Sequence, residues 1–176
     1  MGLEALKRAN AYDCGIWIYD DMCSSKAPMF SPSVFERVFL PVYQPMVSTL
    51  KSAGAKWVIL HCDGNLTPFL DLLLEAGIDG INPVEYAAGM NVCDLLNKYY
   101  GRLRFIGGVC NTHILPSSDF ESIRRHVEMI VDAGVNGGLV AGTHSVGTDI
   151  SVASYELYRK ILTERGDYLA SRRSHA

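Results

Sequence analysis

A histidine and an aspartate follow one short apolar segment of the chain. His61 and Asp63 come directly after residues 57–60, which are bulky and apolar. Because side chains two residues apart in an extended backbone point to the same side, the two groups lie together. Such a pair can hold a metal ion, anchor a polar substrate or act in acid–base catalysis. We interpret both residues as functional, and Cys62, which points to the other side, as a packing residue.

Polar residues also follow four other apolar segments. They are Asp20 and Asp21; Asn82 and Glu85; Cys110, Asn111 and His113; and Thr143, His144 and Ser145. The Gly/Ser/Thr-rich setting of His144 favours a function, whereas Asp20-Asp21 are equally compatible with capping of a loop. Glu85 follows an Asn-Pro turn signal and stays open between the two interpretations. His126, expected in mid-helix among charged residues, and His175 are given no role.

Each of these apolar segments is a predicted strand with a helix after it. The strands are expected near residues 15–19, 57–61, 78–83, 103–109 and 138–142. Helices are expected near residues 3–10, 32–54, 68–77, 91–100, 119–134 and 151–165. Strict alternation of strand and helix predicts a parallel sheet, whose carboxyl ends meet at one edge. The polar residues listed above should therefore converge.

The predicted fold class is α/β, a partial TIM (βα)8 barrel of about five βα units. We expect one domain over residues 1–165 and a frayed tail over residues 166–176. A complete barrel needs about 250 residues, more than the 176 present here. The sheet is therefore expected to be open at two edges, or to be closed by an amino-terminal half-barrel chain or by a second copy in a homodimer.

Local signals refine the helices. Thr67 is predicted to cap the helix that follows it, and residues 118–121 form a capping-box pattern that starts another helix. Phe120 is expected on the inward face of that helix. Pro41 and Pro45 should kink or interrupt the long helix that contains them.

Composition narrows the classes of function. The net charge of −3, 48% apolar residues and 20% charged residues indicate a globular protein with no electrostatic preference for nucleic acid. No apolar run approaches the ~20 residues of a membrane span, so no membrane partner is expected. Five scattered cysteines without a CxxC pair, together with the lack of a secretory signal, favour reduced thiols and a cytoplasmic location.

Taken in order, the motifs resemble the carboxyl-terminal half of the uroporphyrinogen decarboxylase (URO-D) family. The resemblance covers about residues 12–162 and rests on a strand ending in DD, then HCDGN, GIDGINPVE, YGRLRFIGGVCNTHILP and GLVAGTHSV. It implies a (βα)8 barrel and an enzyme, either a lyase (decarboxylase) of porphyrin biosynthesis or a corrinoid or thiol methyltransferase.

The pattern is closer to the methyltransferase-like branch of that family. There a His-x-Cys motif and a later cysteine are zinc ligands. In this chain His61 matches the histidine, Asp63 stands at the first cysteine and His144 at the second. The resemblance thus implies His61, Asp63 and His144 as catalytic residues and zinc ligands. Asp20, Asp21, Glu85 and Asn111, which also follow the predicted strands, are the candidate substrate-binding residues.

Two departures limit the inferred activity. The missing thiolates argue against methyl transfer to a thiol. The Arg-rich motif and catalytic aspartate of true uroporphyrinogen decarboxylases lie outside the matched region. The sequence therefore predicts a truncated URO-D-type enzyme acting on a tetrapyrrole or a small methyl donor, with a corrinoid protein as a possible partner. The alternatives are an inactive half-barrel and a metal- or corrinoid-binding module without turnover.

Overall fold

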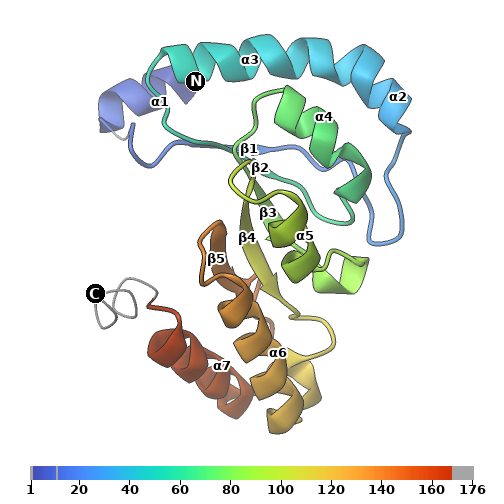
Figure 1. The fold of residues 1–176 in the computed structure, drawn as a ribbon, viewed down its shortest axis with the longest axis vertical. Coiled ribbons are helices and arrows are strands. Elements are labelled where there is room, and N and C mark those ends of the chain that lie inside the picture. The colour runs from blue at the N-terminus through green and yellow to red at the C-terminus, as the bar shows by residue number, and fades with distance from the viewer. Residues whose placement is uncertain (1, 11, 168–176) are drawn as a thin grey trace.

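The computed structural model describes residues 2–10 and 12–167, which contain one sheet of five parallel strands (Figure 1). The strands are β1 (Ile16–Tyr19), β2 (Val58–His61), β3 (Gly80–Val84), β4 (Arg104–Val109) and β5 (Leu139–Thr143). They lie side by side in the order of the sequence, and β1 and β5 form the two edges. This confirms the predicted α/β class and is consistent with a partial TIM barrel.

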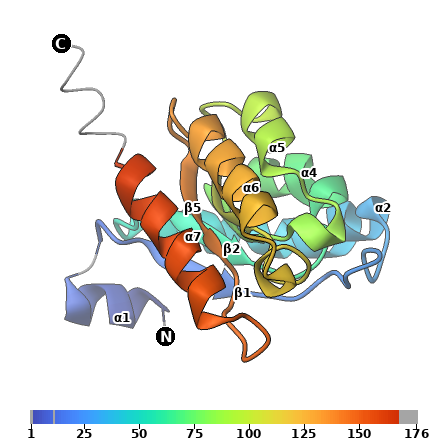
Figure 2. The same ribbon diagram turned by 90° about the horizontal axis from the view of Figure 1, so that it is seen from below.

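A helix follows every strand, as the alternating pattern predicted. The helices are α1 (Gly2–Ala9), α2 (Pro32–Val34), α3 (Leu40–Ser52), α4 (Leu70–Glu75), α5 (Val92–Lys98), α6 (Phe120–Ala133) and α7 (Val152–Arg165). Helices α3 to α6 lie along one face of the sheet, and α7 lies beside α6 (Figures 1 and 2). In the described residues no helix is both long enough and apolar enough to cross a membrane.

The hydrophobic core lies between the sheet and these helices. Alternate strand residues such as Leu60, Ile81 and Phe105 are fully buried and pack against Phe69 of the turn before α4 and Ile130 of α6, among others. The alternation follows from the strand period of two, which points successive side chains to opposite faces. The strand side chains that alternate with these buried ones therefore lie on the second face of the sheet, which is turned away from the helices.

That second, inner face carries apolar side chains that the described residues leave exposed. Tyr19 is 71% exposed and Val140 is 62% exposed. Near the amino ends of the strands the face forms a groove of ≈ 320 Å³ that includes Trp17 and Arg104. The Arg104 guanidinium lies over the ring of Trp57, 4.1 Å from its centroid. Large exposed apolar areas of this kind mark contact surfaces.

Contrary to prediction, the long helix is not interrupted at Pro41 or Pro45 but runs from Pro32 to Ser52 with one widened turn ahead of these prolines. Residues Phe35–Phe39 form a π-helical turn between α2 and α3, in which the N–H of Leu40 donates to the carbonyl of Phe35. Pro41 lies two residues after this turn, in the first turn of α3. Pro45 is accommodated inside α3, and its carbonyl accepts a hydrogen bond from the Thr49 hydroxyl.

Two predicted helix caps and one predicted inward-facing residue were wrong. Thr67 does not cap its helix; instead its N–H donates to the Asn65 side chain, and a 3₁₀ turn over Thr67–Phe69 precedes α4. The cap of α6 is Asp119, which accepts from two backbone N–H groups at its start. This shifts the capping pattern by one residue and leaves Phe120 49% exposed, rather than inward. Neighbouring polar residues compete for the same N–H groups, which makes the choice sensitive to the chain path.

Helix α7 begins as predicted, with the Ser151 hydroxyl accepting the N–H of Ser154. It ends at Arg165. Of the predicted frayed tail, residues 168–176 lie outside the described residues.

Candidate metal and substrate site

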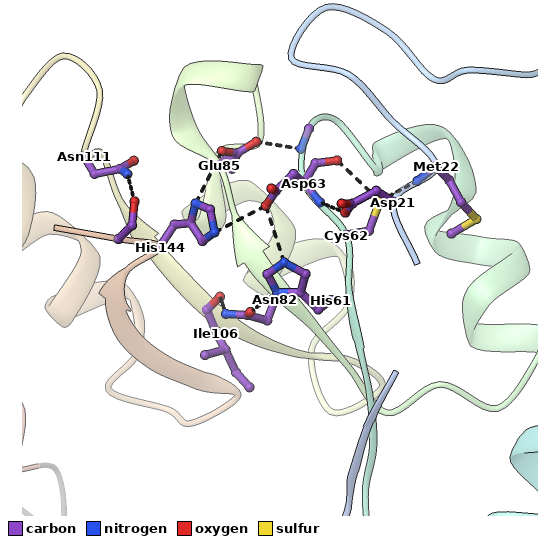
Figure 3. A network of polar contacts seen from close by, with 12 residues as sticks. Asp21, Met22, His61, Cys62, Asp63, Asn82, Glu85, Ile106, Asn111 and His144 are labelled. Carbon is purple, nitrogen blue, oxygen red and sulfur yellow. Dashed lines mark hydrogen bonds and ion pairs between the residues drawn. The ribbon is translucent and has the colours of Figure 1, made fainter. Parts of the chain in front are cut away.

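Three predicted site residues meet at the carboxyl edge of the sheet. His61 ends β2, Asp63 follows two residues later, and His144 follows β5. Asp63 Oδ1 lies 3.7 Å from His61 Nε2 and 3.5 Å from His144 Nε2 (Figure 3). One ligand atom from each residue lies within 4.8 Å of the others. The convergence expected from a parallel sheet is therefore present for this set.

The atom at the centre of this set has no hydrogen-bond partner. Asp63 Oδ1 is buried and accepts no hydrogen bond within the described part of the chain. A buried carboxylate oxygen is costly to leave unpaired. Ligand atoms of a tetrahedral zinc lie about 3.4 Å apart, so the two Asp63–histidine separations fit a shared cation closely. The donor set, two imidazole nitrogens and a carboxylate oxygen, suits zinc and other divalent transition metals.

Both imidazoles present their other nitrogen to an oxygen from the β3 region. His61 Nδ1 lies 2.7 Å from Asn82 Oδ1. His144 Nδ1 lies 4.0 Å from Glu85 Oε1. Metal-binding histidines commonly have an oxygen acceptor on the nitrogen that does not bind the metal. This arrangement therefore leaves both Nε2 atoms facing Asp63.

Two predicted substrate-binding carboxylates hold the loop that carries Asp63. Asp21 Oδ1 accepts a hydrogen bond from the N–H of Asp63 at 3.0 Å. Glu85 Oε2 accepts one from the N–H of Gly64 at 2.6 Å. The remaining Glu85 oxygen faces His144. Both residues belong to the cluster, and their geometry shows that they fix the backbone after β2.

The other two predicted substrate-binding residues lie outside direct contact with the triad. Asp20 Oδ2 accepts a hydrogen bond from the Tyr43 hydroxyl of α3 at 2.6 Å. Burial, and then Asp20 itself, raise the pKa of Tyr43, so this hydroxyl stays protonated. The Asn111 amide donates to Ser145 Oγ at 2.9 Å and joins the loops after β4 and β5. Substrate binding by these two residues stays a prediction.

Cys62 and His126 show two kinds of packing beside the site. Cys62 is fully buried, as predicted, and its sulfur accepts the N–H of Met22 at 3.2 Å. His126 lies in mid-helix, as predicted, but it is buried, and its Nε2 accepts the N–H of Cys110 at 3.0 Å. Burial lowers the pKa of His126. It therefore holds the end of β4 as a neutral ring, a role that the sequence pattern missed.

Sequence reasoning also missed an aromatic side chain beside the triad. The Tyr19 ring lies 4.7 Å from the His61 ring, and Trp17 lies 6.4 Å from Tyr19. The parallel register places Tyr19 directly opposite His61. The period-two rule could have put Tyr19 on the inner face, but the register that sets it beside His61 required the folded sheet.

The charge of the cluster favours a cation. Asp21, Asp63 and Glu85 contribute carboxylates, and no lysine or arginine among the described residues forms an ion pair with them or with Asp20. Like charges gathered at one place are stabilised by a bound cation and disfavour a polyanionic ligand.

Comparison with models of known protein families shows to which family the chain belongs. The model of the family described as uroporphyrinogen decarboxylase (URO-D) matches residues 3–157. The chain belongs to the uroporphyrinogen decarboxylase family. This confirms the resemblance inferred from the HCDGN, GINPVE and GTHSV segments, and it places the triad inside the matched URO-D region.

A solved structure supports the fold of this URO-D family member. The chain is similar to a methyltransferase from Methanosarcina mazei, with a TM-score of 0.66 and 20% sequence identity. The match covers 92% of this chain and 44% of the methyltransferase, so the chain spans less than half the length of that protein. At this identity the likeness shows the fold. No curated protein matches the chain.

Proposed function

We propose that this URO-D family chain provides the metal-holding part of a methyl-transfer site. The observation that carries the proposal is the buried, unpartnered Asp63 Oδ1 between the Nε2 atoms of His61 and His144. A neutral imidazole and a carboxylate are the protein ligands that catalytic zinc sites combine. In this proposal the three residues are the ligands, and zinc is the first candidate ion.

A divalent cation held there would supply Lewis acidity to a donor atom of a small substrate. Three protein ligands leave coordination positions free for such a substrate. The chain's own residues set the position: Asp21 and Glu85 fix the backbone on either side of Asp63. The side chains of Asp63 and His144 are 43% and 30% exposed, against 16% for His61, so an incoming substrate would approach Asp63 and His144 first.

The electrostatics favour methyl transfer over decarboxylation of a polycarboxylate tetrapyrrole. Such a substrate needs cationic partners, and none of the described residues supplies a lysine or arginine to the cluster. A neutral or cationic methyl donor avoids the repulsion. The methyltransferase with the similar fold adds support for this choice. We propose a corrinoid protein as the partner that carries the methyl group.

Completion of the site is a further part of the proposal. The inner face exposes Tyr19 and Val140, and the edges of β1 and β5 are unpaired in the described residues. Additional βα units, from an amino-terminal half barrel or a second copy, would cover this face. They would also exclude water from the side of the triad that the chain leaves open.

Methyl transfer from small neutral or cationic methyl donors, such as methanol and tetramethylammonium, to cob(I)alamin tests the proposal directly. The chain would be assayed with zinc, alone and after co-expression with a URO-D-type amino-terminal half, beside a His144→Ala variant. Zinc-dependent appearance of the cobalt–methyl absorbance with the wild type, and no such appearance with the variant, is the expected result. Zinc binding without transfer in either preparation would identify a binding module. Absence of both zinc binding and methyl transfer would identify an inactive half-barrel. Either of these last two results would overturn the proposal.

A further inference from the structure

We infer that Asn82 is a positioning residue that fixes which nitrogen of His61 faces Asp63. The inference rests on the metal-site function proposed above and assigns to β3 a part in that site. Asn82 is paired with His61 in the parallel register of β2 and β3. Both side chains point to the inner face of the sheet (Figure 3).

The orientation of the Asn82 amide is set by its own neighbours. Its Nδ2 donates a hydrogen bond to the backbone carbonyl of Ile106 in β4, at 3.3 Å. A carbonyl oxygen only accepts hydrogen bonds, so the amide nitrogen must lie on that side. The Asn82 oxygen is consequently the atom that faces His61.

This orientation determines the tautomer of His61. Asn82 Oδ1 lies 2.7 Å from His61 Nδ1, and an amide oxygen is only an acceptor. The Nδ1 atom must therefore carry the proton. In a neutral ring the lone pair then belongs to Nε2, the nitrogen that faces Asp63 Oδ1 at 3.7 Å.

The tautomer explains why Asp63 Oδ1 has no hydrogen-bond partner. A lone pair on Nε2 and a carboxylate oxygen are both acceptors, so neither can satisfy the other. A cation between them satisfies both. Asn82 thus prepares His61 as a ligand before any ion binds, which saves the rearrangement of a wrongly protonated ring.

His144 has a looser version of the same support. Its Nδ1 lies 4.0 Å from Glu85 Oε1, and the other Glu85 oxygen is anchored by the N–H of Gly64. The longer distance makes this a weaker constraint than the 2.7 Å contact at His61. Replacement of Asn82 should therefore disturb the orientation of its histidine more than replacement of Glu85.

Nitrogen-15 NMR of the metal-free protein tests the inference without any activity. At a mildly alkaline pH the two ring nitrogens of His61 have distinct shifts in each tautomer. A His61→Gln variant assigns the signals. We expect the Nδ1–H tautomer in the wild type and in Asn82→Asp, which keeps an acceptor, and a mixture in Asn82→Leu. A wild-type ring protonated on Nε2 would overturn the inference.

Zinc affinity measured by calorimetry gives the second readout. Loss of an outer partner of a metal-bound histidine typically costs 10- to 100-fold in affinity, and we expect a loss of about that size in Asn82→Leu. Asn82→Asp should stay within about threefold of the wild type. The matched control is Asn91→Ala, which removes an amide hydrogen bond at the start of α5 and leaves the triad intact.

The two readouts separate the inference from the proposed function. If the wild type binds no zinc but His61 has the Nδ1–H tautomer only while Asn82 is present, the metal function fails and the positioning role stands. If zinc binds and a folded Asn82→Leu keeps both the tautomer and the affinity, the positioning role fails and the metal function stands.

Discussion

Removal of the His126 imidazole should reduce the stability of the protein and also its dependence on pH. The buried ring accepts the N–H of Cys110 at 3.0 Å, and its pKa is lowered, chiefly by burial and against a hydrogen bond with the Gly108 backbone. In His126→Leu the Cys110 N–H loses its partner inside the protein. An unsatisfied buried donor costs about 1–3 kcal/mol, so we expect a loss of about that size in the free energy of unfolding.

The pH dependence follows from the lowered pKa. Because the unfolded chain binds a proton near pH ~6.5 while the folded ring resists it, the unfolded state holds more protons in the window below that value. The contribution of His126 to the free energy of unfolding is thus fully present above the histidine pKa of the unfolded chain. It is lost as the pH falls from that value toward the lower pKa of the folded ring. Between about pH 7.5 and about pH 5.5 the largest possible loss is about 1.4 kcal/mol.

Urea unfolding at both pH values, for the wild type and for His126→Leu, isolates this contribution. The wild type should lose more stability than the variant on acidification, since other titrating groups are common to both proteins. If the free energy of unfolding fell by the same amount in both proteins on acidification, the neutral, buried state of His126 would be refuted. Zinc binding at the triad should be the same in both proteins, because His126 contacts none of its members.

Three further outcomes follow from single contacts. Tyr43→Phe should cost about 1.5–3 kcal/mol in urea unfolding, because it removes a charge-assisted hydrogen bond to Asp20; an unchanged midpoint would contradict this. Gly107→Ala should lower the melting temperature, since φ of +127° is strained for any side chain, and a variant as stable as the wild type would exclude that strain. Mass spectrometry after brief iodoacetamide treatment should find exposed Cys14 alkylated well before Cys23, whose pKa burial raises to about 12; equal rates would contradict the burial.

The order of the elements was predictable because it depends on local chemistry. Apolar, β-branched segments separated by amphipathic segments specify strands and helices in turn, and strict alternation specifies a parallel sheet. That topology predicted that the polar residues after the strands meet at one edge, and the family resemblance singled out His61, Asp63 and His144 among them. The exact helix starts were not predictable in this way, since Asn65 and Asp119 compete with their neighbours for the same backbone donors.

The surroundings of the triad were less predictable because they depend on register and packing. Asn82 has the local pattern of an ordinary turn residue, and only the pairing of β2 with β3 sets it against His61. His126 has the helical setting of a surface residue, yet it faces the end of β4. Its spacing, three residues after Ile123 and four before Ile130, puts it on the inward face of the helix, a signal that its charged neighbours in the sequence masked.

Zinc content of the purified protein tests the central claim most directly. Elemental analysis would compare the wild type with Asp63→Ala after loading with zinc and removal of the excess. We predict about one zinc per wild-type chain, as three convergent ligands require, and almost none in a folded Asp63→Ala. A wild-type protein without zinc, or a variant that retains it, would contradict a metal site built on His61, Asp63 and His144.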